Sequence, residues 1–136
     1  AQGNAQKVSE SCMNGKEVHV YFSDDANGMY KELQKIALEQ KNQGTENSFE
    51  IQLLKSIDRE IGNLKIDPQK GKHIPRRNIP KQAVMRYNTD RLWKLDLVGF
   101  WRMIYTITGD NVKIITFILE IIDHDEYNKV FGYRGK

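Results

Sequence analysis

The fold is decided by residues 92–122, which read LWKLDLVGFWRMIYTITGDNVKIITFILEII. In the first two of its three apolar runs, apolar and polar residues alternate with the period of two that a half-buried strand requires. Val98-Gly99 and Gly109-Asp110-Asn111 separate the runs with residue types that favour turns. The third run, 112–122, is apolar on both faces. These residues predict a three-stranded antiparallel meander whose last strand is central and covered on both sides.

The alternation also assigns side chains to the two faces of the predicted sheet. One face receives Trp93, Leu95 and Leu97 from the first run and Trp101, Met103, Tyr105 and Ile107 from the second. In the third run, Ile114, Ile118 and Ile122 fall on one side, and Ile115, Phe117, Leu119 and Ile121 on the other. Lys94 and Arg102 fall on the less apolar side of a twisted sheet, where rigid backbone would hold both cations as a binding surface.

The remaining residues predict an α+β fold around this meander, in a single domain at 17–136. A flexible leader is expected at 1–16, a strand at 17–22 and a helix from 24 to about 41. A second helix is expected to begin near 47–48, with an apolar stripe that reaches Leu64 and a stop signal at Gly62-Asn63. An irregular proline-containing loop at 65–91 and a short helix after Asp123 complete the prediction outside the meander. The two long helices are expected to form an antiparallel hairpin over one face of the sheet.

Composition places the chain among small cytoplasmic proteins. It has 136 residues, a formal net charge of +3 and a single cysteine, Cys12, which cannot form an internal disulfide and so favours a reducing compartment. The sequence shows no signal peptide, and its longest apolar stretch is too short to span a bilayer. We therefore expect a cytoplasmic location and no membrane partner.

The positive charge is concentrated in one segment. Residues 1–64 contain 7 Lys and Arg against 10 Asp and Glu, whereas residues 65–94 contain 9 against 2. A basic surface of this density suits a polyanion, and nucleic acid is the most abundant polyanion in a cytoplasm. A solvated basic loop without a partner would have the same composition.

Several common catalytic signatures are missing from the sequence. It contains no P-loop, no dinucleotide-binding glycine pattern, no CxxC, no HExxH and no nucleophile elbow. The acidic cluster Asp123-His124-Asp125 is better explained as a helix N-cap than as a metal site, because three adjacent residues at a helix start cannot all converge on one ion. We expect neither a metal nor another cofactor.

The residues that remain are suited to metal-free RNA cleavage, in which a ribose 2′-hydroxyl attacks the neighbouring phosphate. Arg102 would stabilise the phosphorane, His124 would protonate the leaving 5′-oxygen, and Tyr127, one helical turn later, would orient the base or the phosphate. The expected RNA-binding residues are Lys81, Arg86, Arg91 and Lys94 for the backbone and Tyr133 for base stacking. Each catalytic candidate also has a structural explanation: Arg102 pairing with Asp96, His124 as a capping or core residue, and Tyr127 packed on the sheet.

The order of elements, with W-R-M-I-Y at 101–105 and H-D-E-Y-N-K-V-F-G-Y at 124–133, resembles the RelE/ParE superfamily of toxin–antitoxin toxins. The resemblance covers about residues 17–133 and is strongest with a RelE-like subgroup. It implies a small α+β domain that cuts mRNA, often in the ribosomal A site, until a cognate antitoxin neutralises it. When the motifs are aligned, the resemblance implies that Arg102 and Tyr127 are active-site residues. His124 then takes the place of the basic residue that the family commonly has before the tyrosine.

Two other functions remain open at the level of sequence. Another branch of the superfamily poisons DNA gyrase and lacks nuclease residues, so the chain is also compatible with a non-enzymatic toxin that binds a protein target. A basic RNA-binding module without toxicity would need the same positive surface.

Overall fold

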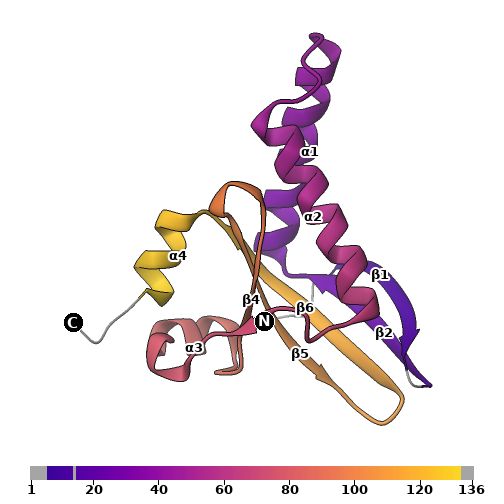
Figure 1. Ribbon diagram of the computed structural model, residues 1–136. Helices are drawn as coiled ribbons and strands as arrows, with labels where there is room; N and C mark the ends of the chain where they lie inside the picture. The colour runs from indigo at the N-terminus through magenta and orange to yellow at the C-terminus, as the bar shows by residue number, and fades with distance from the viewer. Residues whose placement is uncertain (1–5, 14, 133–136) are drawn as a thin grey trace.

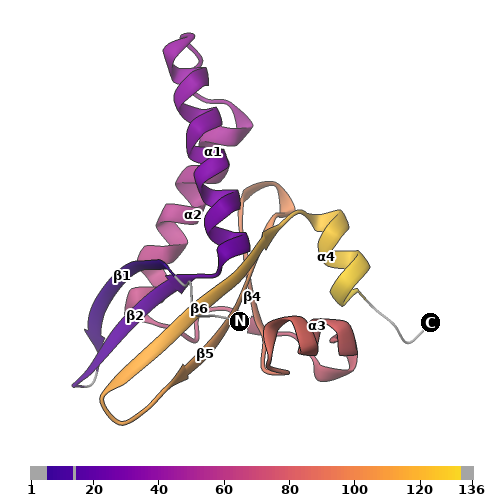
Figure 2. The ribbon, with the colours of Figure 1, turned by 180° about the vertical axis from the view of Figure 1, so that it is seen from behind.

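The computed structural model describes residues 6–13 and 15–132 as a mixed six-stranded sheet between two helical layers (Figures 1 and 2). The strands are β1 (Gln6–Met13), β2 (Lys16–Phe22), β3 (Lys72–His73), β4 (Trp93–Asp96), β5 (Arg102–Gly109) and β6 (Lys113–Ile122), and the α-helices in this part of the chain are α1 (Asp24–Asn42), α2 (Phe49–Ile66), α3 (Lys81–Tyr87) and α4 (His124–Phe131). The fold is therefore α+β, and none of these helices is long and apolar enough to cross a membrane.

Across the sheet the strand order is β1-β2-β6-β5-β4-β3. β4, β5 and β6 pair antiparallel in chain order, while β2 runs parallel to β6 and joins the N-terminal part of the chain to the C-terminal part. The expected flexible leader at 1–16 is wrong for residues 6–13, because β1 pairs antiparallel with β2 and forms one edge of the sheet. Residues 1–5 and 14 of that leader lie outside the described residues.

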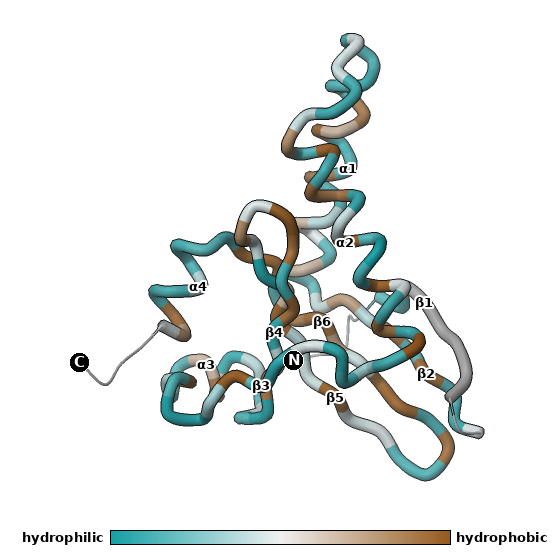
Figure 3. The backbone as a smooth tube through the Cα atoms, viewed as in Figure 1, coloured by the Kyte–Doolittle hydropathy of each residue, from teal (hydrophilic) through white to brown (hydrophobic). Residues whose placement is uncertain are grey.

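One face of the sheet is covered by the hairpin of α1 and α2. Ser23 and Ser48 cap the two helices, each accepting a hydrogen bond from a backbone N–H three residues later. Apolar residues, brown in Figure 3, recur along both helices at the spacing of one buried stripe. Helix α2 continues through Gly62-Asn63 to Ile66, so the predicted stop at Gly62 is wrong. Packing against the sheet explains why α2 continues past Gly62, because Leu64 is fully buried.

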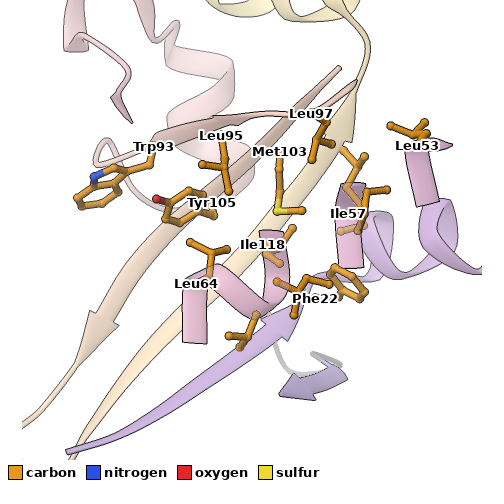
Figure 4. Close-up of a cluster of buried hydrophobic side chains, with 14 of the residues drawn as sticks. Phe22, Leu53, Ile57, Leu64, Trp93, Leu95, Leu97, Met103, Tyr105 and Ile118 are labelled. Carbon is orange, nitrogen blue, oxygen red and sulfur yellow. The ribbon is translucent and has the colours of Figure 1, made fainter. Parts of the chain in front are cut away.

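Between this hairpin and the sheet lies the larger core. Figure 4 shows side chains from α2 meeting those of β2, β4, β5 and β6; among them are Phe22, Leu53, Ile57, Leu64, Trp93, Leu95, Leu97, Met103, Tyr105 and Ile118. The predicted inward face of the first two runs is confirmed for Trp93, Leu95, Met103 and Tyr105, all of them buried. Burying each large side chain contributes about 1.5–3 kcal/mol.

The opposite face is covered by α3 and α4, which enclose a second apolar cluster. The segment 65–91 is more ordered than its four glycine and proline residues indicate, since α3 begins directly after Pro80 and ends at Asn88. Proline favours the start of a helix, where no intrahelical N–H bond is lost, and Asn88 adopts the left-handed conformation, φ 58°, that ends many helices. Ala83 and Tyr87 fill this cluster beneath the helix.

A bulge in β6 exchanges the faces that alternation assigns near its end. Ile104 is opposite Glu120 and Tyr105 is opposite Ile118, which leaves Leu119 as an extra residue. Beyond it, Ile121 joins Ile118 in the larger core. Ile122 packs against the smaller cluster on the opposite face. The predicted faces of Ile121 and Ile122 are therefore wrong, because one inserted residue shifts the period of two.

Candidate nucleic-acid interface

Two cations and one tyrosine from three elements converge on the α3 and α4 side of the sheet. The Lys94 Nζ atom of β4 lies 5.9 Å from the centroid of the Tyr127 ring, and the Arg102 Cζ atom of β5 lies 5.5 Å from the same centroid. Both distances are within the range of cation–π attraction. The structure thus brings together two of the three predicted catalytic residues and one predicted RNA-binding lysine.

Strand register and helix capping position these side chains. Lys94 alternates with inward-facing Trp93 and Leu95, so pleating turns it toward α4. Arg102 is directly opposite Asp96 in the β4–β5 pairing. Helix α4 begins immediately after β6, where the Asp123 Oδ1 atom accepts a hydrogen bond of 2.8 Å from the Glu126 N–H. The predicted N-cap role of the acidic cluster is confirmed for Asp123.

The guanidinium of Arg102 is held against the turn between β4 and β5. Its side chain is 13% exposed. The Nη1 atom donates to the carbonyl of Phe100 at 2.7 Å and to that of Trp101 at 3.3 Å. These bonds fix the direction of the guanidinium and connect its position to the conformation of the turn.

A carboxylate lies between the two cations. The Asp96 Oδ1 atom is 3.1 Å from Lys94 Nζ and 3.1 Å from Arg102 Nε. The first contact is a hydrogen bond, whereas Arg102 Nε has the distance of an ion pair without the alignment of a hydrogen bond. The pairing of Arg102 with Asp96, one of the two alternatives for this arginine, is therefore present. Since the Asp96 side chain is 61% exposed, it can be displaced by another anion.

The tyrosine of the cluster packs against the smaller apolar core. Tyr127 is half-buried, and its ring centroid lies 5.4 Å from that of Phe131 in the smaller core. Burial raises the pKa of the Tyr127 hydroxyl, the Arg102 charge lowers it and the Asp96 charge raises it, with burial the largest cause. The hydroxyl is therefore protonated at neutral pH and acts as a hydrogen-bond donor.

His124 lies at the rim of this cluster. It is exposed on the first turn of α4, and its Nε2 atom lies 3.1 Å from the Asn128 Nδ2 atom. Its ring centroid is 5.9 Å from that of Phe100, whose carbonyl accepts the Arg102 bond. His124 is therefore connected to Arg102 through Phe100, and the N-cap is its neighbour Asp123 rather than His124.

Sequence reasoning missed Phe100, the aromatic residue that links His124 and Arg102. It is 71% exposed at the turn between β4 and β5 and has a positive φ of 63°. The available signal was an aromatic residue directly after Gly99 in a predicted turn, where no core position is expected.

The other predicted RNA-binding residues lie outside this cluster. Lys81 and Arg91 are exposed, at the start of α3 and just before β4. Arg86 forms ion pairs with Asp25 at 2.6 Å and Glu120 at 3.1 Å, so a phosphate has to compete with two carboxylates for it. Tyr133 lies outside the described residues. We name the set of Lys94, Asp96, Phe100, Arg102, His124 and Tyr127 the β4–β5–α4 cluster.

A second polar group lies deeper, between α3 and β6. The Tyr87 hydroxyl donates to Glu120 Oε2 at 2.9 Å, beside the Arg86 ion pair. Burial raises the pKa of the Glu120 carboxyl, and the Tyr87 hydrogen bond and the Arg86 charge lower it to a smaller extent. These three residues line a cavity of about 490 Å³, which is separate from the Arg102 guanidinium.

Among the side chains that the structure describes, those of residues 6–7 and 15–132, no three of His, Cys, Asp or Glu are grouped as a metal site would require. Comparisons of the chain with protein-family models, with curated proteins and with solved structures find no match.

Proposed function

We propose that the chain is a metal-independent endoribonuclease that cleaves mRNA and is the toxin of a type II toxin–antitoxin system, with a RelE-like arrangement of its elements. The observation that carries the proposal is the approach of Lys94 and Arg102 to the Tyr127 ring, at 5.9 and 5.5 Å. Two cations and a neutral phenol on one surface can bind adjacent phosphates and stabilise charge that develops during cleavage.

Each side chain has a defined task in this proposal. A water molecule takes the proton of the 2′-hydroxyl as its oxygen attacks phosphorus, the guanidinium of Arg102 stabilises the phosphorane that forms, and Lys94 holds an adjacent phosphate. The Tyr127 hydroxyl donates a hydrogen bond to a phosphate oxygen, since its raised pKa keeps it protonated. His124 donates a proton to the leaving 5′-oxygen as the bond from phosphorus breaks.

The fold supports the same proposal by analogy. The chain contains the succession of strand, helix hairpin, three antiparallel strands and short terminal helix on which the RelE resemblance is based, and β1, β3 and α3 lie outside that succession. Fold analogy alone does not define an activity, so the proposal depends on the β4–β5–α4 cluster. A cognate antitoxin is the expected protein partner, and the ribosome a further expected one.

Asp96 favours a second candidate, an RNA-binding module without cleavage. Its carboxylate already partners both cations in the free protein. If RNA displaced it only in part, the phosphates would be bound and the phosphorane would lack the full charge of Arg102. Binding without cleavage would be the result.

Cleavage of a defined single-stranded RNA by the purified chain, with and without ribosomes, tests the proposal. We expect Arg102→Ala to lower the cleavage rate by about 10² or more, as is typical for loss of one charge-stabilising donor. Lys113→Ala is the matched control, because it removes one exposed cation at the opposite end of the β5–β6 hairpin. Since the proposed chemistry uses side chains alone, EDTA should leave the rate unchanged.

The results separate the candidates. RNA binding by the wild type without cleavage, with weaker binding by Arg102→Ala, would select the second candidate. Induced expression should arrest growth and shorten mRNA while rRNA remains intact; normal growth with soluble protein and unchanged transcripts would contradict the toxin proposal.

A further inference from the structure

The turn between β4 and β5 contains a large aromatic residue in an unfavourable backbone conformation. Gly99 and Phe100 both have positive φ, 67° and 63°, and the Trp101 N–H donates to the Val98 carbonyl at 3.4 Å. Positive φ at both central residues is the signature of a type I′ turn, which favours Asn, Asp and Gly. Glycine meets this requirement at the first position, but a bulky side chain at the second is an outlier.

Stability does not explain a phenylalanine at this position. Its ring is 71% exposed, so burial offsets little of the strain. Glycine or asparagine would adopt the same φ more easily. Strained residues of this kind occur preferentially at functional sites, where the surrounding structure holds them.

The neighbours of Phe100 indicate what its ring would bind. The His124 ring lies 5.9 Å from it at an interplanar angle of 52°, and its own carbonyl accepts the Arg102 hydrogen bond of 2.7 Å. Arg102 and Lys94 lie on the adjacent surface, each 3.1 Å from the exposed carboxylate of Asp96, whose place an anionic group of a ligand would take. A ligand with a flat apolar part beside an anionic part matches this arrangement, and a nucleotide is such a ligand.

We propose that Phe100 is a stacking platform for an unpaired nucleobase, one whose neighbouring phosphate contacts Arg102. This inference rests on the proposed function and narrows its substrate to single-stranded RNA, because a base in a duplex does not expose its face to a side chain. Stacking on an aromatic ring tolerates every base, so Phe100 contributes affinity and position without selecting a sequence.

The turn also couples base binding to phosphate binding. Arg102 donates to the carbonyls of Phe100 and Trp101, so a base stacked on the ring holds the segment that directs the guanidinium. In this role Phe100 is a binding residue that also positions Arg102.

Phe100→Asn tests the platform with little risk of unfolding, because asparagine tolerates positive φ. The probe is a fluorescent single-stranded RNA analogue with a 2′-O-methyl group in place of each 2′-hydroxyl, which lacks the nucleophile and cannot be cleaved; it is used intact and with single abasic positions. We expect Phe100→Asn to bind the intact probe about 5- to 150-fold more weakly, the range for loss of one stacked base. Phe100→Trp should restore binding. Met85→Asn, which removes an 81% exposed apolar side chain on α3, is the control.

Two further readouts identify the contact. An abasic position should weaken the wild type but not Phe100→Asn, since the base and the ring are partners in one interaction. The dependence of affinity on salt should be unchanged in Phe100→Asn and reduced by about one unit of slope in Arg102→Ala.

The platform and the proposed function fail in different ways. If Phe100→Asn binds like the wild type and the abasic penalties are equal, the platform is wrong, while weaker binding by Arg102→Ala keeps the RNA site. If Phe100→Asn leaves RNA affinity unchanged but weakens binding of a partner protein, the ring is a protein contact and the platform proposal is wrong. If neither variant changes RNA binding, the proposed function itself is contradicted.

Discussion

Replacing Asp96 by asparagine should strengthen RNA binding and weaken the fold slightly. The carboxylate is 3.1 Å from Lys94 Nζ and 3.1 Å from Arg102 Nε, so an incoming phosphate has to break both pairs and approach a like charge. Asparagine keeps the shape and a hydrogen-bonding oxygen but removes the negative charge. An incoming phosphate then approaches both cations without a competing anion.

The structure sets the size of the effect. The Asp96 side chain is 61% exposed, so each pair is worth about 0.2–1 kcal/mol. Two such pairs predict a decrease of about 0.4–2 kcal/mol in the free energy of unfolding. If bound phosphates replace the same two contacts, affinity should rise by a similar free energy, about 2- to 30-fold.

Fluorescence anisotropy with a labelled, cleavage-resistant oligonucleotide at about 50 and 200 mM salt measures the affinity, and urea unfolding measures stability. Glu46→Gln, in the exposed loop between α1 and α2, makes the same change of charge away from the β4–β5–α4 cluster and is the control. Equal or weaker binding by a folded Asp96→Asn protein would refute the argument that this carboxylate competes with phosphate. If Glu46→Gln increases RNA affinity equally, the change in net charge alone explains the effect of Asp96→Asn.

Three further predictions concern the core, the buried carboxyl and the proposed general acid. Met103→Ala, at a fully buried position, should lower the free energy of unfolding by about 2–5 kcal/mol in urea titrations. Burial raises the pKa of Glu120 above its ordinary value of 4.5, so the folded state holds a proton on this carboxyl more tightly than the unfolded state does. The wild type should therefore lose stability relative to Glu120→Gln as pH rises above 4.5, and an unchanged difference would contradict that direction. His124→Gln should slow cleavage and flatten the alkaline decline of the rate, whereas an unchanged pH profile would assign the acid to another group.

Local patterns predicted the first two runs of the sheet correctly because the information is local. The pleat alone directs Trp93, Leu95, Met103 and Tyr105 to one face. The same alternation sends Arg102 to the other face, where it meets Tyr127. The serine caps and apolar stripes of the two long helices are also local signals.

The features that sequence reasoning missed depend on contacts between distant segments. The run at 112–122 is apolar on both faces, so no alternation marks Leu119 as a bulge. Strand β1 has little apolar periodicity, and its backbone pairing with β2 defines it. The sequence alone predicts Arg86 as an RNA-binding cation, because its ion-pair partners Asp25 and Glu120 come from distant segments that only the fold brings together.

The parallel pairing of β2 with β6 has a consequence for the order of folding. The Ser23 Oγ atom at the end of β2 donates to the Leu119 carbonyl at 2.7 Å, a contact across 96 positions of the chain. During synthesis, β2 can pair only with β1 until β6 leaves the ribosome. The apolar stripes of α1 and α2 also lack their contacts with β6 until then. Contacts this distant in sequence slow folding, because a long loop must close before it is stabilised. A nascent chain that ends before β6 therefore exposes the apolar side of its helix hairpin, which makes such fragments substrates for chaperones and proteases.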